Sequence, residues 1–199
     1  MNRFKGKKGM IILALLICML LCYYFYLSNK KEEIKEEHVE ATHVQEVLLR
    51  DLSRNYPATP KEVVKYYGEI TQCFYNEKYS EEQLQLLAER AMMLYDDELA
   101  SYQSELDYIN SLKSDIAAFK QDGIQISSYK VSSSVDVTYK TIDGRECASL
   151  YCTFTMRRNG TLQPVEELFI LRRDEEGHWK ILGWKEAPAE TGAEIEASD

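Results

Sequence analysis

The first strong pattern along the chain is an unbroken apolar run near its start. Residues 10–27 contain no charged side chain and no proline, and ten of them are Leu, Ile or Phe. As an α-helix this run would be about 27 Å long, at roughly 1.5 Å per residue, which approaches the roughly 30 Å hydrocarbon core of a bilayer. Tyr23, Tyr24 and Tyr26 gather at its end, and aromatic side chains favour the membrane interface. The pattern therefore predicts a transmembrane anchor over residues 10–28.

The flanks of this run predict its orientation. Residues 1–9 carry four basic side chains and no acidic one, whereas residues 29–41 mix both signs. Because the basic flank of a transmembrane helix stays inside, we expect a cytoplasmic start, a charged stalk over 29–41 and an extracytoplasmic domain beyond it. A cleaved signal peptide would have a shorter apolar core and small residues at its exit, and Tyr24-Phe25-Tyr26 offers none. The sequence thus predicts a single-pass protein of the cell membrane.

From residue 42 onward, apolar residues recur at helical spacing. Three stretches begin with a capping box, in which Thr42, Thr59 or Ser80 is followed three residues later by Gln or Glu. A further stripe predicts one continuous helix over about 97–121. Its expected buried side consists of Leu99, Tyr102, Leu106, Ile109, Leu112, Ile116 and Phe119. The pattern predicts three to four helices in this part of the chain.

Beyond Gly123 the apolar period drops to two, which is typical of β-strands. Asn159-Gly160 is a strong hairpin signal. The expected strands lie around residues 135–139, 147–156, 168–171 and 179–184. Helices followed by strands predict an α+β domain over residues 42–186, in which helices cover one face of a four-stranded antiparallel meander. The polar tail, residues 187–199, is predicted to be disordered.

The net charge of the residues after Leu27 limits the kinds of partner that the predicted outer domain could bind. The chain has 24 basic and 33 acidic residues, and every acidic residue lies after Leu27. Four basic residues belong to the start, which leaves 20 basic against 33 acidic residues and a net charge of −13 after Leu27. An acidic surface repels phosphate groups, so we expect no nucleic-acid binding. The predicted partners are the bilayer through residues 10–28 and an envelope protein or a small ligand, and the pattern indicates no particular oligomeric state.

Three cysteines belong to the outer domain, Cys73, Cys147 and Cys152. Cys147 and Cys152 lie five apart on one expected strand and point to opposite faces, so they are poorly placed to bond each other. Cys73 and Cys152 both face inward and could form a disulfide. We expect instead that the cysteines are buried as small apolar residues.

The sequence contains few candidates for catalytic or ligand-binding residues. The sequence shows no nucleophile elbow, no phosphate-binding glycine loop and no zinc-ligand spacing, so we assign no catalytic, cofactor-binding or metal-binding residue and no cofactor. We expect His38 and His43 to be solvated, and His178, beside an acidic turn, to be a surface residue. Asp136 or Glu167 would become a candidate base if it lay in a pocket. A possible ligand groove or partner surface consists of Tyr66, Tyr67, Phe74, Tyr75 and Tyr79, although core packing is the default role for aromatic residues at these spacings.

Several short motifs carry a resemblance to a known family. They are Asn55-Tyr56-Pro57-Ala58-Thr59-Pro60-Lys61-Glu62-Val63-Val64, Leu94-Tyr95-Asp96, Asp143-Gly144-Arg145-Glu146, Leu171-Arg172-Arg173-Asp174 and Trp179-Lys180-Ile181-Leu182-Gly183-Trp184. The chain resembles an uncharacterised, membrane-anchored family from anaerobic Gram-positive (clostridial) bacteria, a domain of unknown function. The resemblance covers roughly residues 44–186 and includes the basic and apolar start, and it transfers no functional residue. At the level of fold, helices followed by a sheet ending in this Trp motif resemble the NTF2-like (cystatin-like) superfamily.

These expectations lead to a function hypothesis. Some single-pass proteins with NTF2-like outer domains are scaffolds of secretion or conjugation machines. The fold resemblance suggests such a role for this chain by analogy alone. The absence of catalytic motifs favours a non-catalytic module that binds a ligand or protein in the cell envelope. The alternatives are a small enzyme that uses a carboxylate in an NTF2-like pocket as general base, and a purely structural spacer.

Overall fold

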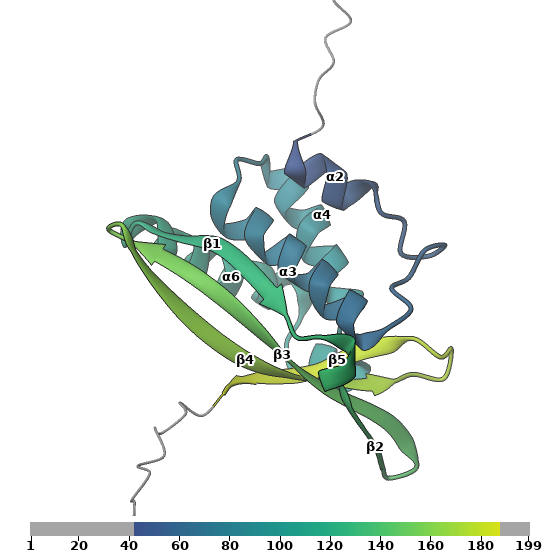
Figure 1. Ribbon diagram of the computed structural model, residues 1–199. Helices are drawn as coiled ribbons and strands as arrows, with labels where there is room; N and C mark the ends of the chain where they lie inside the picture. The colour runs from purple at the N-terminus through teal and green to yellow at the C-terminus, as the bar shows by residue number, and fades with distance from the viewer. Residues whose placement is uncertain (1–41, 188–199) are drawn as a thin grey trace, which may run out of the picture. The chain divides into compact units, whose positions relative to one another are not determined.

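The structure of this chain is a computed structural model, which describes residues 42–187 (Figure 1). The predicted cytoplasmic start, the anchor over 10–28, the stalk and the tail beyond residue 187 lie outside the described residues. No helix within residues 42–187 is long and apolar enough to cross a membrane.

The helices begin where the sequence places its caps. Thr42, Thr59 and Ser80 each accept a hydrogen bond from the backbone N–H three residues later, and all three capping boxes are complete. The helices are α2 (His43–Leu49), α3 (Pro60–Asn76), α4 (Glu81–Met92), α5 (Asp97–Ser101) and α6 (Glu105–Gln121).

The continuous helix predicted over residues 97–121 is wrong, because the chain breaks into α5 and α6. Ser104 is the N-cap of α6, and its hydroxyl accepts a hydrogen bond from the N–H of Asp107 at 3.2 Å. The break exposes two residues of the expected stripe, since Tyr102 is 77% and Leu106 is 68% exposed. The later part of the stripe is confirmed, with Ile109, Leu112 and Ile116 buried.

The sheet is antiparallel, as predicted, but has five strands where four were expected. They are β1 (Ile124–Val131), β2 (Thr138–Ile142), β3 (Arg145–Arg158), β4 (Thr161–Arg173) and β5 (Trp179–Glu186). Their order is β1-β3-β4-β5, and β2 also pairs with β3. β1 contacts the second half of β3 and β2 contacts the first half, so both run along the same edge of β3.

The strand expected around residues 135–139 is only partly correct. Val135 belongs to a short 3₁₀ turn, Ser134–Asp136, and is 87% exposed, while β2 begins at Thr138. The sequence analysis missed β1 because a register shift between Ile126 and Ser128 interrupts the alternation of apolar side chains.

The core lies between the helices and one face of the sheet, which we call the inner face (Figure 1). The predicted alternation on β3 is confirmed, because Ala148, Leu150, Cys152 and Phe154 are all buried. Gly68 permits the close approach of α3 to β1, since a Cβ atom there would lie 2.6 Å from the Tyr129 ring. The α+β class predicted from the sequence is therefore confirmed.

The cysteines of the described residues are buried and free. Cys73, Cys147 and Cys152 form no disulfide. The expectation of buried small residues is confirmed, and the alternative Cys73–Cys152 disulfide is wrong. Burial raises the pKa of the thiols of Cys73 and Cys152 to about 12, so both thiols are protonated at neutral pH.

Candidate functional site

The register of the sheet places one acidic row across the inner face. Val131, Cys152, Glu167 and Glu186 are successive cross-strand partners from β1 through β3 and β4 to β5. Because side chains alternate between faces, all four share the inner face. The row before it consists of Leu150, Phe169 and Trp184, and the row after it of Tyr129, Phe154 and Val165. Glu167 is therefore a half-buried carboxylate with apolar rows on both sides.

Aromatic rings cover this part of the face. The ring of Tyr67, on α3, lies 5.6 Å from that of Phe169 and 5.5 Å from that of Trp184, and Phe169 and Trp184 stack at 5.9 Å. Trp184 remains 39% exposed, so the cluster reaches the surface. We call Tyr67, Glu167, Phe169, Trp184 and Glu186 the Glu167 patch.

Two further tyrosines extend the patch toward the helices. Tyr95 lies 6.0 Å from Trp184 and 6.1 Å from Tyr67, measured between ring centroids. The hydroxyl groups of Tyr95 and Tyr108 are 3.3 Å apart and share a hydrogen bond. Burial raises the pKa of both phenols, so these hydroxyls are neutral donors and acceptors.

The electrostatics of the patch are dominated by an uncompensated carboxylate. Burial, and then the charge of Glu186, raises the pKa of Glu167 above its ordinary value. Burial also raises the pKa of Tyr67, and that of Tyr75 to about 12, and the negative charge of Glu167 adds to both shifts. No ion pair among residues 42–187 involves Glu167. The carboxylate thus favours binding a proton or another positive charge.

A cavity lies further along β4, and none of the five residues of the Glu167 patch lines it. It has a volume of about 420 Å³. Its lining consists of Ile124, Met156, Arg158, Asn159, Thr161, Gln163 and Val165. Gln163 and Val165 lie on the same face of β4 as Glu167, at two-residue spacing. The cavity and the carboxylate therefore share one side of the sheet.

The structure brings together only part of the aromatic set that the sequence singled out. Tyr67 and Tyr75 lie near Glu167, where its charge affects both phenols. Tyr66 belongs to the core, where its hydroxyl donates to the carbonyl of Val47 at 2.9 Å. The Tyr79 hydroxyl donates to the carbonyl of Phe74, and Phe74 is itself buried.

The two carboxylates named as conditional candidates differ in their surroundings. Asp136 is exposed in the 3₁₀ turn, and its carboxylate accepts a hydrogen bond from the Ser133 N–H at 3.2 Å. Glu167 alone of the two lies on the inner face of the sheet, and the cavity found there is lined by Val165, two residues away, and not by Glu167 itself. The sequence alone does not connect Tyr108 with this site, because the connection depends on the packing of α6.

A second carboxylate, Asp96, has an ion-pair partner. Asp96 is 4% exposed, and Nε of Arg172 donates to its Oδ2 at 2.9 Å, with a second hydrogen bond from Nη2 to Oδ1. Arg172 also lies 3.1 Å from Glu98. Burial by itself would raise the pKa of Asp96, but the hydrogen bonds from Arg172 and from the Glu98 N–H lower it below its ordinary value. This pair joins the start of α5 to β4.

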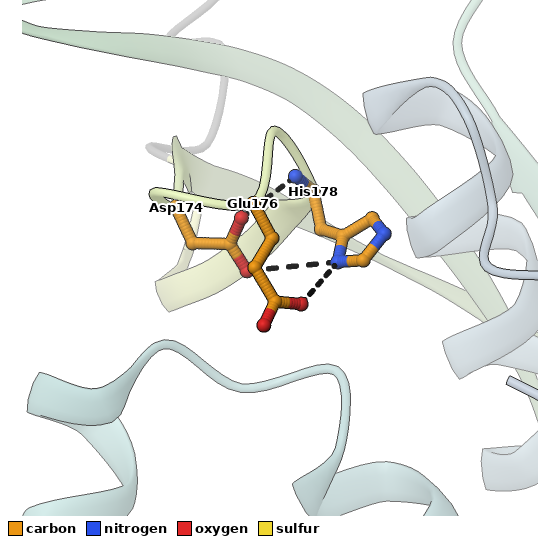
Figure 2. Close-up of side chains that lie close together, drawn as sticks. All are labelled: Asp174, Glu176 and His178. Carbon is orange, nitrogen blue, oxygen red and sulfur yellow. Dashed lines mark hydrogen bonds and ion pairs between the residues drawn. The ribbon is translucent and has the colours of Figure 1, made fainter. Parts of the chain in front are cut away.

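A third cluster, Asp174, Glu176 and His178, occupies the turn between β4 and β5 (Figure 2). Nδ1 of His178 lies 3.8 Å from Asp174 Oδ2 and 3.4 Å from Glu176 Oε2. An imidazole and two carboxylates are groups that bind divalent cations. The turn explains their proximity, because the His178 N–H donates to Asp174 Oδ1 at 2.7 Å and the Gly177 N–H donates to the Asp174 carbonyl.

His178 lies at the surface, as expected from the sequence. Its side chain is about two-fifths exposed, and its ring packs 4.4 Å from that of Tyr56. The nearby cavity of about 450 Å³ is of mixed charge. It is lined by Asp96, Asp97, Arg145, Arg172, Asp174, Glu175, Glu176 and Lys180. Five acidic and three basic residues line it, so positive charges are present there, in contrast to the Glu167 patch.

Helices pack on one face of an antiparallel sheet, and an unpaired carboxylate lies on that face. These features define the domain as an α+β protein with a candidate site on the inner face of its sheet. The chain belongs to the family described as Domain of unknown function (DUF6715), whose model matches residues 1–184. The match includes the basic start and the apolar run.

The chain is also similar to several solved structures. A solved NTF2-like protein with a cystatin-like fold from Novosphingobium aromaticivorans is similar to this chain with a TM-score of 0.41 and 13% sequence identity. The similarity covers 67% of this chain and 81% of that one. No curated protein matches this chain. The NTF2-like assignment made from the sequence stays a prediction.

Proposed function

We propose that this chain is a membrane-anchored protein whose extracytoplasmic domain binds a ligand without catalysis at the Glu167 patch. The apolar run over residues 10–28 and its basic flank support the membrane address. The observation that carries the binding role is the half-buried Glu167 carboxylate, which has no ion-pair partner within residues 42–187 and lies beside exposed aromatic surface. An unpaired carboxylate in such a place destabilises the free protein, and a ligand that completes the site would remove that cost.

The shape of the site favours a small ligand over a protein partner. The cavity whose lining includes Val165, two residues from Glu167 on the same face of β4, has a volume of about 420 Å³, which falls within the size range of small-molecule sites, roughly 300–1,000 Å³. Such sites combine aromatic and apolar walls with a few polar groups that orient the ligand. The Glu167 patch and the tyrosine hydroxyls behind it have this composition.

Ligand-observed NMR with the full-length chain in maltoside micelles tests the binding role. We expect members of a fragment set with cationic, neutral and anionic compounds to bind the wild type. The same members should lose binding in the Glu167→Gln and Trp184→Ala variants. Glu166→Gln is the matched control, because Glu166 neighbours Glu167 but lies on the opposite face. Fragments that bind all variants equally, or a set with no binder, would contradict the proposal.

Cysteine labelling of intact cells tests the proposed topology. The cysteines of residues 42–187 are buried, so Ser134→Cys in the exposed 3₁₀ turn supplies a reactive thiol in the outer domain. A membrane-impermeant maleimide should label this variant in intact cells. Asn2→Cys is the control for the cytoplasmic side and should react only after lysis. The reverse pattern would overturn the orientation.

A second candidate function is a small enzyme in which Glu167 acts as general base. The raised pKa of Glu167 favours it, because a base with a pKa nearer neutrality transfers protons more effectively. Prolonged incubation of a bound fragment with stoichiometric protein separates the two functions. A ligand recovered unchanged supports the binding module, whereas conversion that stops in Glu167→Gln supports the enzyme.

A further inference from the structure

The charge around Glu167 determines which ligands can complete the patch. Glu167 and Glu186 are direct cross-strand partners on the inner face, and like charges in this arrangement destabilise a sheet. The other titratable groups that face Glu167 are Tyr67 and Tyr75 from α3 and Cys152 from β3. None of these groups carries a positive charge. An anionic ligand would be repelled, and a neutral one would leave the carboxylate uncompensated.

The rings of the patch favour a positive charge as well. Tyr67, Phe169 and Trp184 lie within 5.5–5.9 Å of one another. The negative face of an aromatic ring attracts ammonium groups, with Trp the strongest of the side chains. Trp184 is the exposed member, so part of its ring surface is open to a ligand from solution.

The surroundings of Glu167 favour an organic cation over a metal ion as the ligand. Hard cations such as Ca²⁺ take six to eight oxygen ligands. The Glu167 patch offers two carboxylates and one phenol, and the rest of its surface is apolar. An organic cation can place its charge at the carboxylates and its carbon atoms against the rings, which satisfies both kinds of surface.

From this arrangement we propose that the Glu167 patch binds small organic cations that carry a primary or quaternary ammonium group. The proposal rests on the ligand-binding function above and names the chemical class of its ligand. Glu167 and Glu186 supply the negative charge, and Tyr67 and Trp184 supply the aromatic surface. The acidic character of the chain after Leu27 raises the local concentration of cations.

Fluorescence of Trp184 provides a direct test. The chain has two tryptophans, and in a Trp179→Phe background Trp184 is the sole reporter. The full-length chain in maltoside micelles is titrated with tetramethylammonium chloride, with tert-butanol as a neutral compound of similar size and sodium chloride as an ionic-strength control. We expect a saturable change with tetramethylammonium alone. Glu167→Gln should weaken it at least tenfold, and Glu166→Gln should not change it.

A second readout does not depend on a variant. Lowering the pH below 4.5, the ordinary glutamate pKa, protonates Glu167 and should abolish the tetramethylammonium response of the wild type. Equal responses to tetramethylammonium and tert-butanol, or an unchanged affinity in Glu167→Gln, would overturn the cation proposal. If neutral fragments still bind at the patch, the binding function stands and only the ligand class is wrong. If no compound binds there, both proposals fail.

Discussion

Asp96 and Glu167 are two shielded carboxylates of one domain, and their surroundings are opposite. Asp96 is held by Arg172, and hydrogen bonds from Arg172 and the Glu98 N–H outweigh the effect of its burial and lower its pKa. Glu167 has apolar neighbours and a second carboxylate, Glu186, so its pKa is raised. Both residues lose water on folding, but only one of them receives a counter-charge.

The difference separates a structural role from a binding role. The Asp96–Arg172 pair fixes the start of α5 to β4, and a fully compensated charge leaves nothing for a ligand to supply. Glu167 weakens the free protein slightly and lies beside aromatic rings. Groups that are costly to the free protein are characteristic of functional sites, and we therefore assign the site to Glu167.

The largest effect is expected from removal of the paired carboxylate. Asp96→Ala leaves Arg172 without its main partner and removes the N-cap of α5, so the free energy of unfolding should fall by about 3–5 kcal/mol. Urea denaturation of the full-length chain measures the loss. Asp97→Ala, at the exposed neighbour, is the control and should cost less than about 0.5 kcal/mol. Equal losses of unfolding free energy in the two variants would contradict a structural role for the Asp96–Arg172 pair.

The two tryptophans of β5 give the next largest contrast. Trp179 is 7% exposed and Trp184 is 39% exposed. Trp179→Ala should therefore cost about 3–5 kcal/mol, whereas Trp184→Ala should cost only about 1–2 kcal/mol because part of its surface is already in water. Thermal denaturation compares them directly. A larger loss at Trp184 would make it a core residue and not a binding surface.

A smaller effect of opposite sign is expected at Glu167. Glu167→Gln removes the repulsion from Glu186, so stability at pH 7 should stay the same or rise by up to about 1 kcal/mol. The urea midpoint measures this change, with Glu166→Gln as control. A loss above about 1 kcal/mol would show that the charged form of Glu167 stabilises the fold through a partner that the comparison omits.

The two carboxylates also predict opposite pH dependences. The lowered pKa of Asp96 contributes stability that is present above its unfolded pKa of 3.8 and is lost as the pH falls through the folded pKa. The raised pKa of Glu167 contributes stability that is present below its unfolded pKa of 4.5 and is lost as the pH rises through the folded pKa. Urea titrations of the wild type, Asp96→Ala and Glu167→Gln at several pH values measure each contribution. A variant whose pH profile matches the wild type would contradict its assigned shift.

Local sequence signals predicted much of the fold. The capping boxes at Thr42, Thr59 and Ser80 marked three helix starts, and alternation along β3 identified its buried face. The break before α6 was missed because the apolar stripe continues across Ser104, where a single hydroxyl ends the continuity. The strand β1 was missed because its register shift breaks the alternation.

Less of the candidate site could be predicted from the sequence. Tyr67 and Glu167 are 100 positions apart, and their proximity depends on how α3 packs on the sheet and on the register of β4 with β5. The sequence suggested both residues as conditional candidates, within a larger set that included Tyr66 and Asp136. Only tertiary packing distinguishes a tyrosine of the core from one that lies beside an unpaired carboxylate.

The most direct test is to measure the two carboxyl pKa values in one sample. A ¹³C NMR titration of the full-length chain in micelles, with the Asp96→Asn and Glu167→Gln variants to assign the resonances, gives both values under identical conditions. The account predicts that Glu167 titrates above 4.5 and Asp96 below 3.8. A Glu167 pKa at or below 4.5 would mean that its charge is already compensated in the free protein, and the binding site proposed for it would be contradicted.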